Sequence, residues 1–187
     1  MPDKAKTQRL SRLSWIKTAF DTLYEEGIEQ VRVERLAKKL KVTKGSFYWH
    51  FRDRAELLDA LIEYWNDEMT RTVLENAEMF HGDPKERIVS TLAYIISNER
   101  TKYDPAVRAW ANHDPEAKKY VEKVDKLRLS FLVGLMRDAG YDEEESEIRA
   151  RMIYYYVLGE AYVTRKESRS VRLKRIESKA KIFLAAP

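Results

Sequence analysis

Residues 33–54 contain the pattern that most restricts the fold of this chain: two short helices joined by a tight turn. The sequence of this stretch is VERLAKKLKVTKGSFYWHFRDR. Leu36, Ala37 and Leu40 share one face at helical spacing, which predicts an amphipathic first helix. Thr43 is the predicted N-cap of the second helix, because its hydroxyl can accept a hydrogen bond from a free N–H of the first turn.

The second helix is predicted to have one buried face and one outer face. Phe47 and Phe51 are four residues apart, so both would point toward the core. The other side chains form an outer arc of the kind that a helix-turn-helix places in the major groove of DNA. This arc consists of Lys44, Gly45, Ser46, Tyr48, Trp49 and His50.

The run VTKGSFYWHFRDRAELLDAL resembles the DNA-binding signature of the tetracycline-repressor (TetR) family of bacterial transcriptional regulators. The resemblance covers roughly the first quarter of the chain, and the remainder is similar to the family only in length and helical pattern. The matching features are the Leu36-Ala37 pair, the hydrophobic-Thr-Lys-Gly turn, the Phe47-Tyr48 pair, and Phe51 followed by a polar bend into a Glu-Leu-Leu helix.

Two residues depart from the family pattern. Val33 stands where the family usually has a capping Thr or Ser, so the first helix is expected to start less firmly. Lys41 stands where a Gly often ends that helix. If Lys41 is left-handed, its side chain adds strain of roughly 1 kcal/mol.

The resemblance implies an all-α protein with two domains. Residues 1–53 would be a three-helix, helix-turn-helix DNA-binding domain, and residues 54–187 a larger helical domain for effector binding and dimerisation. Residue type and position in the motif suggest the contacts with DNA. Lys44 would contact a guanine or a phosphate, Ser46 a base edge or a phosphate, and Gly45 would let the backbone approach closely. Tyr48 and His50 would contact phosphate or sugar, and Trp49 a sugar or a thymine methyl. Arg54 would hold a flanking phosphate. Tyr48 and Trp49 could instead be half-buried braces.

Apolar spacing and capping residues predict helices along the rest of the chain, with no strand pattern. Asp83-Pro84, Asp104-Pro105 and Asp114-Pro115 each predict a helix start, since Asp is a good N-cap and Pro suits the first helical position. Asp142 would open another helix. The expected helices are 10–26, 53–80, 84–103, 105–112, 115–139, one from 142, and 169–184.

The charge is unevenly distributed along the chain. Residues 1–54 hold 13 Lys and Arg against 7 Asp and Glu, a net charge of +6, and the remainder has a net charge of −2. A positive excess on the segment with the helix-turn-helix is typical of a phosphate-binding module. Residues 1–9 are expected to be either a disordered arm or an arm that reaches DNA phosphate through Lys4, Lys6 or Arg9.

Several classes of protein are disfavoured by the composition. There is no cysteine, so neither a disulfide nor a thiolate site is possible. No apolar run approaches the roughly 20 residues that cross a membrane, and a cytoplasmic location is expected. His50, His81 and His113 lack ligand spacing, and no catalytic motif is present, so we expect no enzyme, cofactor or metal site.

The C-terminal part contains candidates for an effector pocket and for a dimer interface. A small aromatic or amphipathic effector is expected from the lining candidates Trp65, Tyr94, Trp110, His113, Arg128, Phe131, Tyr154 and Tyr155, although aromatics at helical spacing more often fill a core. The resemblance implies that the last two helices pair with a second subunit through Met152, Tyr156, Leu173, Ile176, Ala180 and Phe183. From the spacing alone, the stripe on the last helix more naturally faces the chain's own core.

These observations favour a DNA-binding transcriptional regulator. The expected protein is a ligand-responsive repressor that binds an inverted-repeat operator on double-stranded DNA as a homodimer. The alternative is an all-helical small-molecule carrier or scaffold that does not bind DNA.

Overall fold

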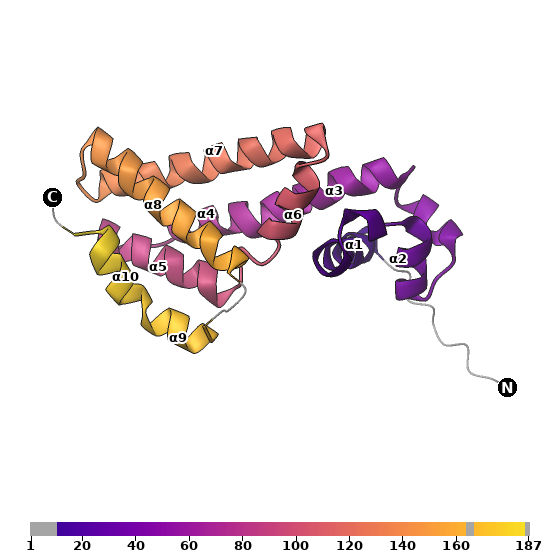
Figure 1. The fold of residues 1–187 in the computed structure, drawn as a ribbon, viewed down its shortest axis with the longest axis horizontal. Coiled ribbons are helices and arrows are strands. Elements are labelled where there is room, and N and C mark those ends of the chain that lie inside the picture. The colour runs from indigo at the N-terminus through magenta and orange to yellow at the C-terminus, as the bar shows by residue number, and fades with distance from the viewer. Residues whose placement is uncertain (1–10, 164–166, 186–187) are drawn as a thin grey trace. The chain divides into compact units, whose positions relative to one another are not determined.

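The computed structural model describes residues 11–163 and 167–185, and all regular structure in these ranges is helical, which confirms the all-α prediction (Figure 1). The chain divides into two compact units, Met1–Tyr64 and Trp65–Pro187, and the boundary in the sequence falls within helix α3 (Arg54–Asn66). The arm expected for residues 1–9 lies outside the described residues. Within those residues, no helix has both the length and the apolar character needed to cross a bilayer.

The N-terminal unit contains the predicted helix-turn-helix. Helix α1 (Arg12–Glu26) is followed by α2 (Val33–Leu40), by the 3₁₀ helix η2 (Lys44–Trp49) and by the start of α3. Gly27 ends α1 at φ 87°, a conformation that glycine adopts without strain. The short 3₁₀ helix η1 (Ile28–Gln30) leads from there toward α2.

Aromatic packing holds the second helix of the motif against the first unit's core. Phe47 and Phe51 are 0% and 2% exposed, as their spacing predicts. The Phe47 ring stacks on Phe51 at 5.2 Å and meets the buried Trp15 of α1 edge-on at 5.3 Å. The outer arc is therefore carried on a segment whose other face is anchored by three buried rings.

Neither helix of the motif has a side-chain cap at its start, as expected for the first helix and contrary to the prediction for Thr43. The residue that precedes α2 is Arg32, which makes no capping bond through its side chain, and Val33 is the first helical residue. Thr43 precedes η2 but its hydroxyl caps nothing; instead, the Thr43 carbonyl accepts from Ser46 N at 3.0 Å. A 3₁₀ helix bonds residues three apart, so the backbone itself fills the role we predicted for the hydroxyl.

The turn between the two helices depends on a left-handed lysine. Lys41 has φ 57° and ψ 41°, and its N–H donates to the Lys38 carbonyl at 3.2 Å. We expect Lys41→Gly to stabilise the chain by about 1 kcal/mol, because glycine adopts this conformation without a clash at Cβ. Chemical denaturation of the two proteins measures the difference. Lys38→Gly, inside α2, is the matched control and should destabilise by about 1 kcal/mol; equal effects at both sites would refute the strain at Lys41.

The C-terminal unit is built from α4 (Thr72–Glu78), α5 (Pro84–Ser97), α6 (Asp104–Ala111), α7 (Pro115–Asp138), α8 (Glu143–Tyr162), α9 (Arg169–Lys174) and α10 (Ile176–Phe183). Asp83, Asp114 and Asp142 cap α5, α7 and α8 through side-chain hydrogen bonds, as predicted. Asp104 does not cap α6. It is the first residue of that helix, and its carboxylate is fully buried.

Two helices predicted as continuous are interrupted. The stretch 53–80 contains a π-helical segment, η3 (Asp67–Arg71), between α3 and α4. The stretch 169–184 is divided at Arg175 into α9 and α10. Apolar periodicity continues through such local changes of pitch, which is why the sequence did not reveal them.

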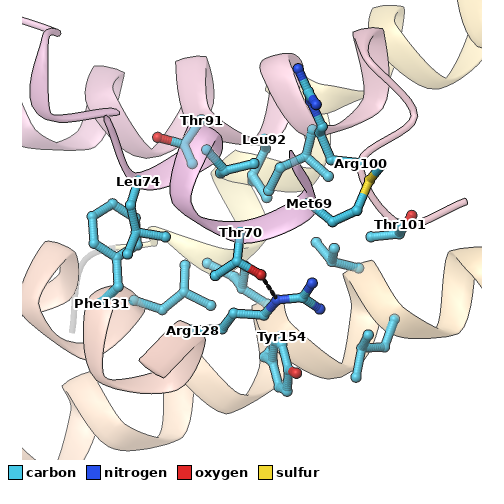
Figure 2. A pocket seen from close by; sticks show the side chains of 16 residues that line it. Met69, Thr70, Leu74, Thr91, Leu92, Arg100, Thr101, Arg128, Phe131 and Tyr154 are labelled. Atoms are coloured by element: carbon cyan, nitrogen blue, oxygen red, sulfur yellow. Dashed lines mark hydrogen bonds between the residues drawn. The ribbon is translucent and has the colours of Figure 1, made fainter. Parts of the chain in front are cut away.

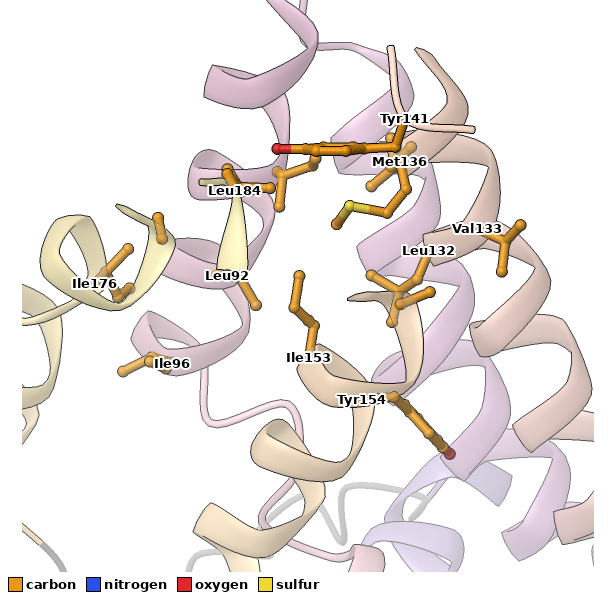
Figure 3. Packing of buried hydrophobic residues seen from close by; sticks show 14 residues of the cluster. Leu92, Ile96, Leu132, Val133, Met136, Tyr141, Ile153, Tyr154, Ile176 and Leu184 are labelled. Carbon is orange, nitrogen blue, oxygen red and sulfur yellow. The ribbon is translucent and has the colours of Figure 1, made fainter. Parts of the chain in front are cut away.

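The core of this unit is a cluster of aliphatic side chains between α5, α7, α8 and α10 (Figure 3). Leu92 of α5, Leu132 of α7 and Ile153 of α8 point toward one another across it. Tyr141 is 6% exposed, and its hydroxyl donates to the Ala185 carbonyl at 3.3 Å. Ile176 brings α10 into the same cluster.

Candidate nucleic-acid interface and ligand cavity

The outer arc of the helix-turn-helix is accessible along its whole length. Trp49 is 87% exposed and Tyr48 is 55% exposed, so Trp49 is not a half-buried brace. Lys44 and Gly45 are also exposed, and Ser46 and His50 are half-buried. Tyr48 combines both roles that we considered, because its ring also meets Phe47 edge-on at 5.4 Å.

Lys44, the basic residue of the arc, is paired with an acidic residue of α2. Its Nζ donates to the Glu34 carboxylate, and both side chains are largely exposed. The hydrogen bond from Lys44 lowers the pKa of Glu34, and the bond to Glu34 raises the pKa of Lys44. Lys44 is therefore held in its charged form, and its ammonium must leave or share this carboxylate to reach a base or a phosphate.

The side chain of Arg54 is bonded to the main chain of the motif. Its Nε donates to the Val31 carbonyl at 2.7 Å and its Nη2 to the Ile28 carbonyl at 3.0 Å. These bonds fasten the first turn of α3 to the segment before α2. The geometry thus gives Arg54 a bracing role that the sequence did not reveal, because its acceptors lie 23 and 26 positions away.

The C-terminal unit contains a cavity of about 50 Å³ among η3, α4, α5, α7 and α8 (Figure 2). Its wall is mainly aliphatic, with Phe131 on one side. The polar side chains that reach it are those of Thr70, Thr91, Arg100, Thr101, Arg128 and Tyr154. An apolar wall with few polar groups is typical of small-molecule sites, but this space is well below the roughly 300–1,000 Å³ of such sites.

The structure brings only part of the predicted pocket set to this cavity. Arg128, Phe131 and Tyr154 line it. Trp65 and Trp110 are buried in the interior of the unit, where their indole N–H groups donate to Asp104 at 2.7 Å and to Asp114 at 3.0 Å. The other three, Tyr94, His113 and Tyr155, are not among the residues that line it, and His113 and Tyr155 are exposed.

A buried ionic network lies beside the cavity. Asp104 accepts from Arg128 Nη1 at 2.9 Å and from Trp65 Nε1 at 2.7 Å, and Arg128 Nε donates to Thr70 Oγ1 at 2.9 Å. Burial opposes the charge on Arg128, but Asp104 outweighs this and holds the pKa of Arg128 above its ordinary value. The predicted cap Asp104 is in fact the buried counterion of the predicted pocket residue Arg128.

A second ion pair extends this network. Arg108 donates both Nη atoms to Asp125, at 2.9 and 2.5 Å, and Tyr154 Oη donates to the same carboxylate at 2.6 Å. Burial would raise the pKa of Asp125, but these hydrogen bonds and the charge of Arg108 lower it. Burial is the main cause that raises the pKa of Tyr154, so its hydroxyl stays protonated and remains a donor.

The stripe proposed for the dimer interface is largely covered by the chain itself. Ile176 and Ala180 are each 4% exposed and belong to the core cluster, and Leu173 and Phe183 pack against it. Phe183 also meets the ring of Tyr156 at 5.5 Å. The apolar surface of the buried members is thus already used within the chain, and the assignment of this stripe to a subunit contact stays a prediction. Met152, in contrast, is 46% exposed.

Comparison with known proteins identifies the N-terminal motif. Residues 16–61 match the family model described as bacterial regulatory proteins, tetR family. The chain is 28% identical over 156 residues to the tetracycline repressor protein class C of Escherichia coli, covering 81% of this chain and 64% of that protein. It is 28% identical over 82 residues to the HTH-type transcriptional regulator AcrR of Shigella flexneri, covering 42% of this chain and 38% of that protein.

Residues 16–61 therefore form a DNA-binding segment of the TetR type. The family that this model describes consists of bacterial regulatory proteins. The chain spans less than two thirds of the length of the two curated relatives just described. The likeness to solved structures supports the same fold over most of the chain. A transcriptional regulator from Rhodococcus sp. Rha1 has a TM-score of 0.71 at 19% identity, covering 94% of each chain. A Saccharomonospora viridis protein solved in complex with choline has a TM-score of 0.70 at 12% identity, covering 89% of this chain and 93% of that one.

Proposed function

We propose that this protein is a DNA-binding repressor that reads an inverted-repeat operator as a homodimer and responds to a small molecule. The observation that carries the proposal is the exposed arc of η2, which presents Lys44, Tyr48 and Trp49 while Phe47 anchors the opposite face. The positive charge of residues 1–54 supports it. Two of the similar proteins are named as a repressor and as a transcriptional regulator.

In this proposal the two domains that we inferred from the sequence have separate functions. Residues 1–53 would read DNA, and residues 54–187 would bind the ligand and the second subunit. Ser46 and His50 complete the proposed contact set with Gly45, whose lack of a side chain permits close approach of the backbone. We retain Arg54 in the set for its position at the edge of the motif, with the bracing of α3 as its main role.

Selection of bound sites from random duplex DNA tests the proposal. A dimer with two recognition helices should select an inverted repeat whose half-sites are about one helical turn apart, roughly 34–36 Å. Enrichment of single half-sites would contradict the dimeric arrangement, and no enrichment at all would contradict sequence-specific DNA binding.

Lys44 gives a test at the level of one side chain. Lys44→Ala should weaken binding to the selected operator by about 1–3 kcal/mol if the ammonium contacts a guanine. A gel-shift titration measures this loss. Lys123→Ala, on the exposed surface of α7, removes the same charge from the other unit and serves as the control. Unchanged affinity of the Lys44 variant would remove Lys44 from the recognition set.

The exposed face of α8 is the proposed site of the second subunit. Ile148, Met152 and Tyr155 are 52%, 46% and 59% exposed and follow one another at four- and three-residue steps. We expect the double variant Met152→Glu and Tyr155→Glu to weaken the dimer at least about tenfold, since charges would enter an apolar contact. Sedimentation at micromolar concentration measures this, with the exposed Met79→Glu as control. A parent protein that sediments as a monomer would contradict the proposal.

The apolar wall of the cavity in the C-terminal unit supports a small-molecule ligand, which would have to widen a space of about 50 Å³. The aromatic or amphipathic ligand expected from the sequence suits its aliphatic wall, Phe131 and the few polar groups. To release DNA, the ligand must bind more tightly to the arrangement that does not bind DNA. The runner-up function, a carrier without DNA binding, would use the same cavity.

A further inference from the structure

The outer arc of the helix-turn-helix has a carboxylate beside its lysine. Glu34 lies in the first turn of α2, and its side chain is 65% exposed. It accepts a hydrogen bond from the ammonium of Lys44, the first residue of η2, whose side chain is 51% exposed. The arc therefore presents a joined donor and acceptor to solvent, and not a cation alone.

A carboxylate at this place needs a reason, because the DNA backbone is covered with negative charge. The hydrogen bond from Lys44 lowers the pKa of Glu34, so this carboxylate is ionised at neutral pH. An ionised carboxylate only accepts hydrogen bonds, and phosphate oxygens offer it no donor. An acidic residue in the first turn of a helix also stabilises that helix through its dipole, but this role needs no partner on η2.

The edges of the base pairs in the major groove do offer donors to a carboxylate. These donors are the amino groups at cytosine N4 and adenine N6. A G·C pair presents guanine N7, guanine O6 and cytosine N4 in that order, which is acceptor, acceptor, donor. An A·T pair presents adenine N7, adenine N6 and thymine O4, which is acceptor, donor, acceptor. The order of the groups distinguishes the two pairs.

The pairing of Lys44 with Glu34 has the order that a G·C pair requires. An ammonium has three donors, so one bond to Glu34 leaves two N–H groups for guanine N7 and O6. Lys44 bonds one of the two oxygens of Glu34, so the carboxylate keeps acceptor capacity for cytosine N4. Guanine O6 and cytosine N4 are themselves hydrogen-bonded neighbours, as the two side chains are. On an A·T pair the adenine amino group separates the two acceptors, so the ammonium could reach only one of them.

We propose that Lys44 and Glu34 together read one G·C pair in each half-site, with Lys44 on the guanine and Glu34 on the amino group of the cytosine. The inference rests on the proposed DNA-binding function and adds a specificity-determining residue on α2 to the contacts of η2. Because the pattern of donors and acceptors is asymmetric, the base pair is read in one orientation, and C·G is not equivalent to G·C.

Selection of bound sites with the full chain and with Glu34→Ala tests this role. The parent should select G·C in a fixed orientation at the position where Lys44→Ala loses its preference. In gel-shift titrations, changing this pair to A·T in one half-site should weaken the parent roughly 10–100-fold, and should weaken Glu34→Ala at least about fivefold less. A purely structural role of Glu34 would weaken binding to every base pair by the same factor. Equal discrimination by the two proteins, or selection of A·T, would overturn the inference.

An altered base isolates the contact with cytosine. 2-Pyrimidinone lacks only the N4 amino group of cytosine, so opposite guanine it removes the proposed donor and keeps N7 and O6. It should weaken the parent about tenfold and Glu34→Ala less than about threefold. Inosine in place of guanine keeps the whole major-groove pattern and should change the affinity of each protein less than about twofold. Equal losses of the two proteins on 2-pyrimidinone would overturn the contact between Glu34 and cytosine.

A matched control separates base reading from a general effect of charge. Glu63→Gln removes one carboxylate from the exposed surface of α3 in the same unit and should leave the base preference unchanged. Thermal unfolding establishes that each variant is folded. A change of preference in Glu63→Gln equal to that in Glu34→Ala would show that the effect comes from net charge, which would overturn the inference.

The outcome is separable from that of the proposed function. An enriched inverted repeat with the same base preference for the parent and for Glu34→Ala would refute the role of Glu34 and leave the DNA-binding proposal intact. Failure of the parent to enrich any site would refute the DNA-binding proposal, and this inference with it.

Discussion

Asp104→Asn is expected to lower the free energy of unfolding by about 3–5 kcal/mol, the cost of leaving a buried charge without its counterion. Asn has nearly the same shape, so the loss comes from charge and not from a cavity. Arg128 is 11% exposed and cannot turn to water without breaking its bond to Thr70. The indole of Trp65 would also lose a charged acceptor at 2.7 Å. Chemical denaturation of the full chain measures the change, if the signal that is followed reports unfolding of the C-terminal unit, which contains α6 and α7.

A matched control and a compensating variant make this prediction specific. Asp138, at the end of α7, is 58% exposed and lies 3.5 Å from Arg87, so Asp138→Asn should cost less than about 1 kcal/mol. Replacing both partners, as Asp104→Leu with Arg128→Met, removes the unpaired charge and should restore much of the lost stability. A small effect of Asp104→Asn by itself would show that Arg128 has another counterion.

Operator affinity is expected to fall roughly 10³–10⁵-fold between about 50 and about 200 mM salt if the dimer contacts roughly 6–10 phosphates. The reason is that each phosphate neutralised by a lysine or arginine releases condensed counterions. The net charge of +6 on residues 1–54 supplies the cations for such contacts. Fluorescence anisotropy with the selected duplex, measured across this range of salt, gives the slope of log affinity against log salt.

Variants decide which lysines contribute to this slope. Lys44→Ala should reduce the slope by about 1 if the ammonium contacts a phosphate, and should leave it nearly unchanged if it contacts a base. Lys123→Ala, in the other unit, should not change it. A salt-insensitive complex would favour the carrier function over DNA binding, because phosphate contacts dominate non-specific affinity for DNA.

The pairing of Lys44 with Glu34 affects both the operator affinity and the salt slope measured for Lys44→Ala. Any contact of Lys44 with DNA is made by an ammonium that is also bonded to this carboxylate, which lies on the neighbouring helix α2. The measured effect of Lys44→Ala therefore includes the exposure of Glu34 to the nucleic acid, and the loss of affinity should be larger than that of the contact alone.

The sequence by itself determined those features whose physical causes lie within a few residues. The Asp residues that cap α5, α7 and α8 act on N–H groups two or three positions away, and Gly27 ends α1 through its own backbone freedom. The spacing of Phe47 and Phe51 correctly predicted the buried side of the recognition segment, and therefore its outer arc. Local hydrogen bonds and helical period can be read from the sequence because they involve near neighbours.

The tertiary structure decided what depends on distant partners. Asp104 looked like one more cap, but its partners Trp65 and Arg128 lie 39 and 24 positions away, and burial among them changes its role. The stripe on α10 suited either a second subunit or the chain's own core, and folding placed its buried members against the core cluster. Glu34 carried no sequence signal for DNA recognition, because its bond to Lys44 forms only when folding brings α2 and η2 together.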